Sequence, residues 1–254
     1  RALEDSPLAN ALTNGALDYY WGDGRVVYDP PEKLLEERGD SERYLLGQLS
    51  PMMETLGDEL IVFSPSFVPG WDGVAALGAL SERGVRVRIL TNSLASNDVP
   101  IVHAGYLKFR RALLRAGVEL YELNSRTLEA PREAGGGIGS SRASLHAKSF
   151  VLDRRTVFIG SLNLDARAVY FNTEIGVVLQ SPEMAGNMGR YFDERIGRAA
   201  FRLELVADDS GAETLLWHGV VDGEPRVFDH EPYASVWQRF VVNFLGMFPI
   251  QSQL

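Results

Sequence analysis

The sequence contains no cysteine, which excludes disulfide scaffolds, cysteine-ligated zinc, iron–sulfur clusters and thiolate nucleophiles. Basic residues are also in the minority, because 25 Lys and Arg stand against 34 Asp and Glu, for a formal net charge of -9. A protein that binds nucleic acid mainly by neutralising phosphates would carry a basic surplus, so this charge argues against nucleic acid as a partner. Any chemistry must use oxygen or nitrogen side chains.

Long hydrophobic runs are missing too. The best run, Phe240 to Ile250, falls short of the ~18 apolar residues that suggest a membrane-spanning helix. The chain begins at Arg1 without Met or a signal-peptide pattern, and we interpret this start as processed or truncated. With 45% hydrophobic and 23% charged residues over 254 positions, the chain is expected to fold with a substantial core.

Apolar runs alternate with helix-periodic segments along most of the chain. The predicted strands are 24–29, 59–64, 85–90, 118–123, 144–152, 156–159 and 174–179, with others around Leu203, Leu216 and Val227. The predicted helices are 41–56, a segment around Val74, Leu77 and Leu80 closed by Gly84, 105–115, 182–196 and 232–245. This order predicts an α/β fold with parallel strand pairs. Residues 1–20 are expected to be a lead-in and 21–254 one domain, with the last ~50 residues packed on it as an extension.

Two features that could suggest a ligand do not support one. The glycine-rich run 135–139 resembles a phosphate-binding loop, but no Lys follows it and the GxGxxG spacing fails, so we expect a mobile surface loop. His218 and His230 have no acidic neighbours at metal-ligand spacing, so no metal site is expected there.

His146, Lys148 and Asp153 form the pattern HxKxxxxD in a segment whose alternation favours a strand. With a period of two, His146 and Lys148 project from one face and Asp153 from the other. An imidazole can attack or protonate while a nearby ammonium holds phosphate oxygens, so the pair suits phosphoryl chemistry. His146 and Lys148 are the candidate catalytic groups, and Asp153 takes a supporting role in the same motif. The alternative is chance, but 4 His, 3 Lys and 15 Asp predict only ~0.003 occurrences.

Downstream residues add polar groups of the same kind. Ser161 and Asn163 follow the next predicted strand and can donate neutral hydrogen bonds to a phosphate oxygen. Glu174 begins another strand, where its carboxylate could accept the His146 N–H and fix its tautomer. The alternative for Glu174 is a surface carboxylate on an edge strand.

Together these elements resemble the phospholipase D superfamily, whose members carry HxKxxxxD, then GSxN, then NxE. The run GSLNLDARAVYFNTE, from Gly160 to Glu174, is similar to the GSxNxDxRSxxxNxE of bacterial cardiolipin synthases, with Ala168 at the usual Ser position. The resemblance implies a mixed β-sheet sandwiched between α-helices, no cofactor and no required metal. It also implies a two-step displacement through a phosphohistidine.

Upstream segments extend the resemblance. The segment Ser64 to Gly70 is similar to the SPYFVPG of the same group, with Ser66 at the usual Tyr position. The segment around Asn92 and that from 102 to 106 also fit the pattern. His103 and Tyr106 thereby become candidates for the substrate pocket, the alternatives being a structural histidine and a packed tyrosine.

The superfamily mechanism needs two HxKxxxxD motifs facing one phosphate, and this chain has one copy. The resemblance is to the second half of the two-motif enzymes, so the chain is expected to be the C-terminal half of a longer protein. His146 would then act as general acid and base, with the nucleophile in the half upstream. The partner is therefore that second half or, alternatively, a second copy of the chain.

The expected function is phosphatidyl transfer between phospholipids, yielding cardiolipin, by an enzyme attached peripherally to the bacterial inner membrane. One alternative is a homodimeric phosphodiesterase or nuclease with one motif per chain; another is a non-catalytic lipid-binding half. The aromatic segment from Val236 to Leu245 could lie on a membrane surface. Core packing is the preferred interpretation of that segment, because basic residues are scarce in it.

Overall fold

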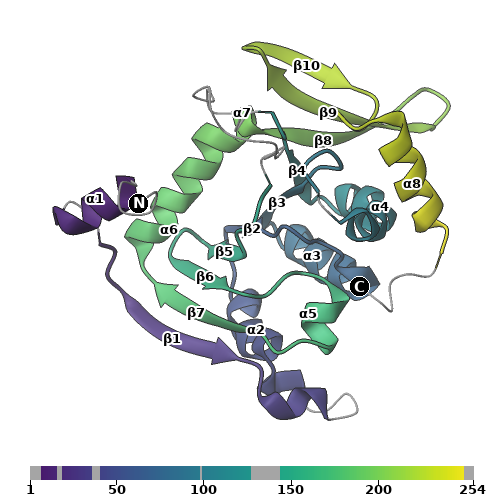
Figure 1. Cartoon of the computed structure of the whole chain (residues 1–254). Helices are drawn as coiled ribbons and strands as arrows, with labels where there is room; N and C mark the ends of the chain where they lie inside the picture. The colour runs from purple at the N-terminus through teal and green to yellow at the C-terminus, as the bar shows by residue number, and fades with distance from the viewer. Residues whose placement is uncertain (1–6, 16–18, 36–40, 98, 127–143, 249–254) are drawn as a thin grey trace.

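The computed structural model describes residues 7–15, 19–35, 41–97, 99–126 and 144–248 (Figure 1). The glycine-rich run 135–139 lies outside these residues. Across the described part of the chain, ten strands form one sheet in the order β1-β7-β6-β5-β2-β3-β4-β8-β9-β10. The strands are β1 (Asp23–Tyr28), β2 (Glu59–Phe63), β3 (Arg86–Asn92), β4 (Glu119–Leu123), β5 (Ser149–Leu152), β6 (Thr156–Gly160), β7 (Ile175–Gln180), β8 (Ala200–Ala207), β9 (Glu213–Val221) and β10 (Glu224–Phe228).

The sheet is mixed, as predicted. Strands β2, β3 and β4 pair in parallel, and every other neighbouring pair is antiparallel. Parallel neighbours need a crossover, and α3 (Gly70–Glu82) and α4 (Pro100–Arg115) supply the two crossovers here. Gly84, predicted to close the helix before β3, follows α3 with a φ of +88°, a conformation that favours glycine.

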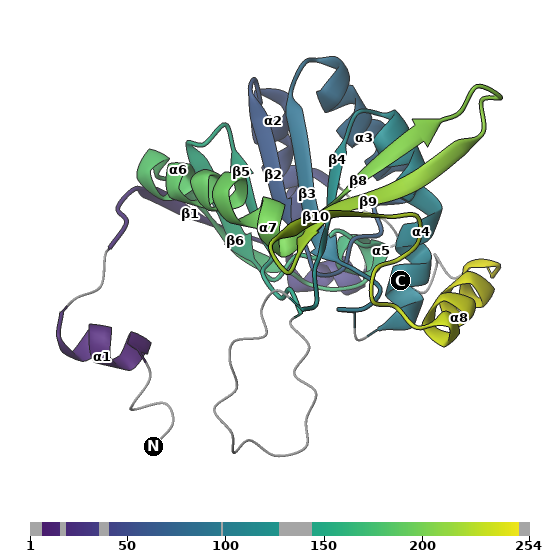
Figure 2. The same cartoon turned by 90° about the horizontal axis from the view of Figure 1, so that it is seen from above.

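Helices cover the central strands on both faces, which confirms the predicted sandwich (Figure 2). Alternate β2 side chains enter two different cores: Leu60 and Val62 join one with α2 (Leu45–Glu54), α3 and α4. Ile61 and Phe63 join the other, which includes side chains of α6 (Pro182–Tyr191) and of the π-helix η3 (Phe192–Ile196). Burial on both faces explains why β2 is a continuous apolar run rather than an alternating one.

The remaining elements lie toward the two ends of the chain. A short helix α1 (Pro7–Thr13) occupies part of the predicted lead-in, and the 3-10 turns η1 (Pro31–Leu34) and η2 (Ser41–Arg43) precede α2. The helices α5 (Ala166–Tyr170) and α7 (Gly197–Ala199) precede β7 and β8. Strands β8 to β10 continue the main sheet, so the C-terminal residues share its hydrogen-bond ladder.

The last helix, α8 (Val236–Gly246), packs on α4 by one face only. Val242 is buried there beside Leu94 and Ala104. The aromatic residues on its other face are exposed, with Trp237 at 70% and Phe240 at 58%. The preferred interpretation of core packing therefore holds for the Val242 face and is wrong for the aromatic face, because no described element covers that face.

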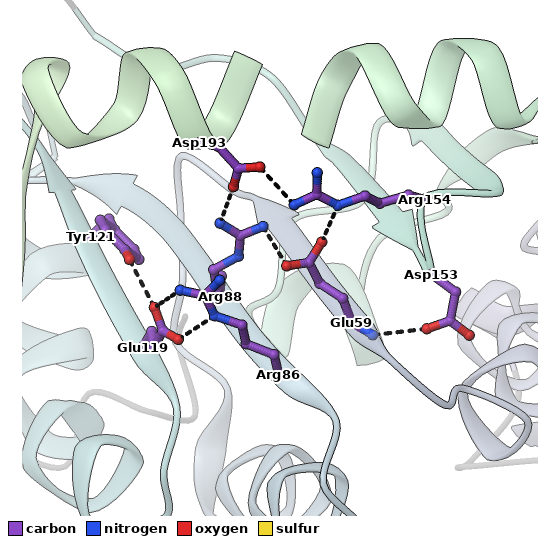
Figure 3. A network of polar contacts seen from close by, with 8 residues as sticks. All are labelled: Glu59, Arg86, Arg88, Glu119, Tyr121, Asp153, Arg154 and Asp193. Atoms are coloured by element: carbon purple, nitrogen blue, oxygen red, sulfur yellow. Dashed lines mark hydrogen bonds and ion pairs between the residues drawn. The ribbon is translucent and has the colours of Figure 1, made fainter. Parts of the chain in front are cut away.

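A closed network of ion pairs joins the strands to η3 at one edge of the sheet (Figure 3). Glu59, the first residue of β2, accepts a hydrogen bond from Arg88 of β3. Its other carboxylate oxygen accepts one from Arg154 Nε at 2.8 Å. Asp193 of η3 accepts from the same two guanidinium groups at 2.6 and 2.8 Å. Burial opposes ionisation of Asp193, but the hydrogen bonds from Arg88 and Arg154 outweigh it and hold its pKa below the ordinary value.

We expect Arg88→Met to lower the free energy of unfolding by ~3–5 kcal/mol at pH 7, because Glu59 stays buried with one of its two cations gone. The matched control Arg202→Met removes an exposed pair with Glu204 and should cost ~1 kcal/mol or less. Carboxylates with depressed pKa values stabilise the fold above their unfolded pKa and lose that effect as the pH falls, so the Arg88→Met deficit should shrink in acid. Unfolding by urea, monitored by circular dichroism at pH 7 and at pH 2.5, measures both effects, because the depressed pKa of Asp193 places the loss below the ordinary carboxyl value of 3.8. Equal losses in the two variants at pH 7 would contradict the role of the network.

Candidate active site

The strand directions bring the sequence motifs to one edge of the sheet. In the registers, Ser149 at the start of β5 lies beside both Phe63 at the end of β2 and Ile159 near the end of β6. Gly160, the last residue of β6, pairs with Gly176 at the start of β7. The segments that precede β5, follow β6 and precede β7 therefore meet at the edge where β2 and β3 end. This edge lies opposite the ion-pair network.

His146 and Lys148 lie in the segment that leads into β5. The predicted strand 144–152 forms only from Ser149, because the side chain of Asn92 takes the place of a strand partner farther out. Asn92 Nδ2 donates to the Leu145 carbonyl at 3.2 Å, and Asn92 Oδ1 accepts from the Leu145 N–H at 2.8 Å. The His146 side chain is exposed, and the half-buried Lys148 Nζ donates to the His146 carbonyl at 3.3 Å. An accessible imidazole thus belongs to the same residue whose carbonyl holds the Lys148 ammonium group, on a backbone fixed by Asn92.

Ser161 and Glu174 contact each other directly. Ser161 Oγ donates to Glu174 Oε2, and it accepts from the Ile175 N–H at 3.1 Å. Asn172 Nδ2 donates to the other Glu174 oxygen at 3.4 Å. The expected hydrogen bond between Glu174 and His146 is not among the contacts of the described residues, where the carboxylate accepts from the side chains of Ser161 and Asn172. Glu174 is 7% exposed, so it is also not the surface carboxylate that was the alternative.

The turn before Ser161 needs glycine. A Cβ added at Gly160 would lie 2.5 Å from the Ile175 carbonyl oxygen and 2.8 Å from the Gly176 Cα. Such a close approach of two backbones excludes any side chain. The glycine therefore lets β6 run close against β7 and delivers Ser161 to Glu174.

A buried ion pair between Asp29 and Lys33 holds the backbone of Glu174. The sequence analysis did not predict this pair. Lys33 Nζ lies 2.7 Å from Asp29 Oδ2 and donates to the Ala168 carbonyl at 3.1 Å. Asp29 Oδ2 also accepts the Glu174 N–H at 2.9 Å, while its other oxygen accepts the Leu45 N–H at 2.8 Å. Asp29 and Lys33 are each 5% exposed. The only signal in the sequence is an Asp and a Lys four positions apart after a strand, which is common on solvated surfaces.

Two serines join the loop after β2 to the loop after β6. Ser66 Oγ donates to Asp165 Oδ2 at 2.7 Å, and Ser64 Oγ accepts the Leu164 N–H at 3.3 Å. Asp165 also caps α5 by accepting the Ala168 N–H at 2.9 Å. Asn163 lies within the second loop, and its buried Oδ1 has no hydrogen-bond partner in the described structure. The site edge therefore contains a buried amide oxygen that has no partner among the described residues.

Asp153 lies at the far end of β5 from His146. Its carboxylate accepts the backbone N–H groups of Gly57, Asp58 and Glu59 at 3.0, 2.8 and 2.8 Å. Burial alone would raise the pKa of Asp153, but these hydrogen bonds outweigh it and hold the pKa below its ordinary value. The contacts of Asp153 are thus with the turn before β2, across the length of the strand from the imidazole.

His103 and Tyr106 lie side by side in the interior of α4. Their rings are 5.6 Å apart, and their exposed fractions are 1% and 2%. Burial, and then the charge of Arg110, lower the pKa of His103 to about 3, so its imidazole is neutral. In the described structure, the two ring nitrogens of His103 and the hydroxyl of Tyr106 have no hydrogen-bond partner. Both residues are therefore packed, and a role in the substrate pocket stays a prediction.

The arrangement suits a tetrahedral phosphate anion. An exposed imidazole and an ammonium group come from one segment at this edge, and such donors stabilise charge that moves between phosphate oxygens. No group of three potential metal ligands occurs among the residues with described positions. The chemistry open to this edge is nucleophilic or acid–base catalysis at phosphorus.

Comparison with known proteins identifies the family of the chain. Residues 51–196 match the family model described as cardiolipin synthase, PLD-like domain. The chain is 38% identical to cardiolipin synthase C of Escherichia coli over 254 residues, which are 99% of this chain and 52% of that protein. It is 29% identical to cardiolipin synthase A of Yersinia pseudotuberculosis over 65% of this chain and 29% of that protein. The chain thus spans about half the length of the first of these relatives and less of the second.

Two solved structures share the fold. Nuc of Salmonella typhimurium, a phospholipase D family member, superposes with a TM-score of 0.51 at 18% identity over 72% of this chain and 98% of its own. The phosphatidylserine synthase of Haemophilus influenzae superposes with a TM-score of 0.52 at 15% identity over 89% of this chain and 45% of its own. At these identities the structures bear on the fold alone. Since the family model spans more than half of the chain, the chain belongs to the phospholipase D-like family of cardiolipin synthases.

Proposed function

We propose that this chain forms part of a phosphatidyltransferase that joins two phospholipids into cardiolipin, with His146 as its general acid and base. The observation that carries the proposal is the meeting of His146, Lys148, Ser161 and Glu174 at one sheet edge, in a chain of the cardiolipin synthase family. Phosphatidylglycerol is the proposed substrate, both as phosphatidyl donor and as acceptor.

The proposed reaction has two displacements at phosphorus. In the first, the histidine of a second HxKxxxxD motif bonds to phosphorus while the bond to the glycerol headgroup breaks, and His146 gives its proton to the leaving oxygen. In the second, the hydroxyl of another phosphatidylglycerol bonds to phosphorus, the phosphorus–histidine bond breaks, and His146 takes back a proton. Lys148 holds the phosphate oxygens in both steps, and free glycerol is the second product.

The second motif is proposed to come from another half of the intact protein. One feature that supports such a partner is an apolar face beside the site. Val26 and Tyr28 of β1 pair with Val177 and Ile175 of β7, and all four side chains are 45–59% exposed. Ile159 of β6 pairs with Val177 and is 45% exposed, so the face extends over three strands. Packing against a second half would bury this face and bring two motifs together.

We expect His146→Ala to lower cardiolipin formation by the intact protein by ~10²–10⁴-fold, the range that general acid–base groups contribute. The control His230→Ala alters an exposed histidine that pairs with Asp229 away from the motifs, and should leave the rate unchanged. Incubation with phosphatidylglycerol vesicles, followed by quantification of cardiolipin and of free glycerol, measures both.

Three results would argue against the proposal. The intact protein could form neither product, or His146→Ala could retain the wild-type rate. The third is hydrolysis of DNA or of bis-p-nitrophenyl phosphate without cardiolipin formation, which would favour the phosphodiesterase alternative. If this chain alone is inert, activity restored by adding the other half would assign the second motif to that half.

The exposed face of α8 supports peripheral attachment to the membrane that holds the substrate, and we propose the bacterial inner membrane. Trp237, Phe240, Phe244 and Phe248 form a continuous row of rings, with successive centroids 5.6, 6.3 and 5.3 Å apart. Lys108 donates to the Phe248 carbonyl at 2.7 Å and places a cation beside this row. Exposed aromatics next to a cation suit an anionic lipid interface. Among the described helices, none is long and apolar enough to cross a bilayer.

The triple variant Trp237→Ser, Phe240→Ser and Phe244→Ser should reduce the fraction bound to phosphatidylglycerol-containing liposomes by ~10-fold or more, because the apolar area available for insertion is lost. The variant leaves Val242 on the packed face, so α8 should keep its place on α4. Trp21→Ser is the control, since Trp21 is 83% exposed and lies outside α8. Flotation in a density gradient gives the bound fractions, and unchanged binding of the triple variant would remove the membrane role of α8.

A further inference from the structure

A large apolar groove lies between α2, α3 and α5, over the sheet face formed by β2 and β5. Its volume is about 610 Å³. Leu60, Val62 and Phe150 form its floor, while Ala76 and Leu77 of α3 and Val169 of α5 form its walls. The groove is separate from the His146 edge, but it shares the loop after β6 with that edge, because Leu164 also lines it.

The size of the groove requires an explanation. Protein interiors are close-packed, and voids larger than a water molecule are few in each domain. Ligand pockets typically measure ~300–1,000 Å³, so this groove is in their range. Small residues of α3 hold it open: Ala76 is exposed to it, and Gly73 cannot be enlarged without conflict, since an added Cβ would lie 2.6 Å from the Pro69 side chain.

The groove runs along β2 from one edge of the sheet to the other. At the site edge it is bounded by Val68 and by Asp165, which holds Ser66. At the opposite edge it is bounded by Glu54 and Arg83, where Arg83 donates to the Glu54 carbonyl at 3.0 Å. Polar groups therefore stand at the two ends of the groove, and its middle is apolar.

This distribution distinguishes between possible occupants. A peptide segment would bring backbone N–H and C=O groups into the middle of the groove, where they would lack hydrogen-bond partners. A hydrocarbon chain has no polar groups along its length and matches an apolar channel with polar ends. The opening at the site edge would leave the head of such a chain near the loop that carries Asn163 and Leu164.

We propose that the groove binds one acyl chain of the phospholipid whose phosphate reacts at the His146 edge. The inference rests on the proposed function for the identity of the lipid. The acyl chain enters between Val68 and Asp165 and extends toward Leu80 and Arg83. By holding this chain, the groove positions the phosphate of the same lipid.

The experiment measures binding of cis-parinaric acid, a fluorescent long-chain fatty acid that lacks a phosphate. Ala76→Trp places a large ring in the groove and should weaken binding by ~10-fold or more, equivalent to at least about 1.4 kcal/mol. Ala79→Trp is the matched control, because Ala79 is exposed on the same helix and does not line the groove. The affinity of this variant for cis-parinaric acid should stay within ~2-fold of the wild-type affinity. Circular dichroism verifies that both variants fold.

A second measurement needs no variant. A fatty acid with a diazirine at its tail end, photolysed with the wild-type protein, should label the peptide that contains Leu80 and Arg83. Absence of probe binding, equal affinities of Ala76→Trp and the wild type, or labelling confined to other peptides would each overturn the proposal. If the probe binds as expected and the intact protein makes no cardiolipin, the proposed function is wrong and acyl-chain binding in the groove is retained. If the intact protein makes cardiolipin and the probe does not bind in the groove, acyl-chain binding there is wrong and the proposed function is retained.

Discussion

The antiparallel pairing of β5 with β2 determines where the segment with His146 and Lys148 lies. Because β5 begins where β2 ends, the segment with His146 emerges at the edge that also receives the loops after β2, β3 and β6. Both faces of these strands are buried, with Phe150 in one core and Val151 in the other, so a shift of one residue would exchange the two sets of side chains. The register that packs the core is thus the register that assembles the site.

The two edges of the sheet have opposite electrostatic character. At the edge of Asp153 and Glu59, charges are matched within the protein, and Arg88 is held by two carboxylates while it stacks on Phe192 at 4.6 Å. At the edge of His146, the imidazole is exposed and the ammonium group of Lys148 contacts the His146 carbonyl. The first edge pairs its charges within the protein, while the second keeps an imidazole and an ammonium group available for an anion, as a pre-organised site requires.

The sequence predicts the order of strands and helices well because apolar periodicity is local. The parallel central strands and the helices between them follow from it, the Gly84 turn follows from the residue type, and the family resemblance supplies the mixed sheet and identifies His146 in advance of any structure. Contacts between distant segments are another matter. The contact of Glu174 with Ser161 depends on how β6 and β7 align, and the burial of Asp29 with Lys33 depends on how β1 and β7 align. No local pattern encodes either alignment. The exposure of the α8 aromatics likewise depends on which face α4 covers.

The dependence of Glu174 on Asp29 has a consequence for the boundaries of the folding unit. The family match begins at residue 51, whereas Asp29 and Lys33 belong to the segment before it. A chain trimmed to the matched residues would lose β1, leave β7 as an unprotected sheet edge open to intermolecular pairing, and remove the acceptor of the Glu174 N–H. The folding unit is therefore larger than the stretch of recognisable similarity, because β1 lies outside that stretch and pairs with the edge of β7.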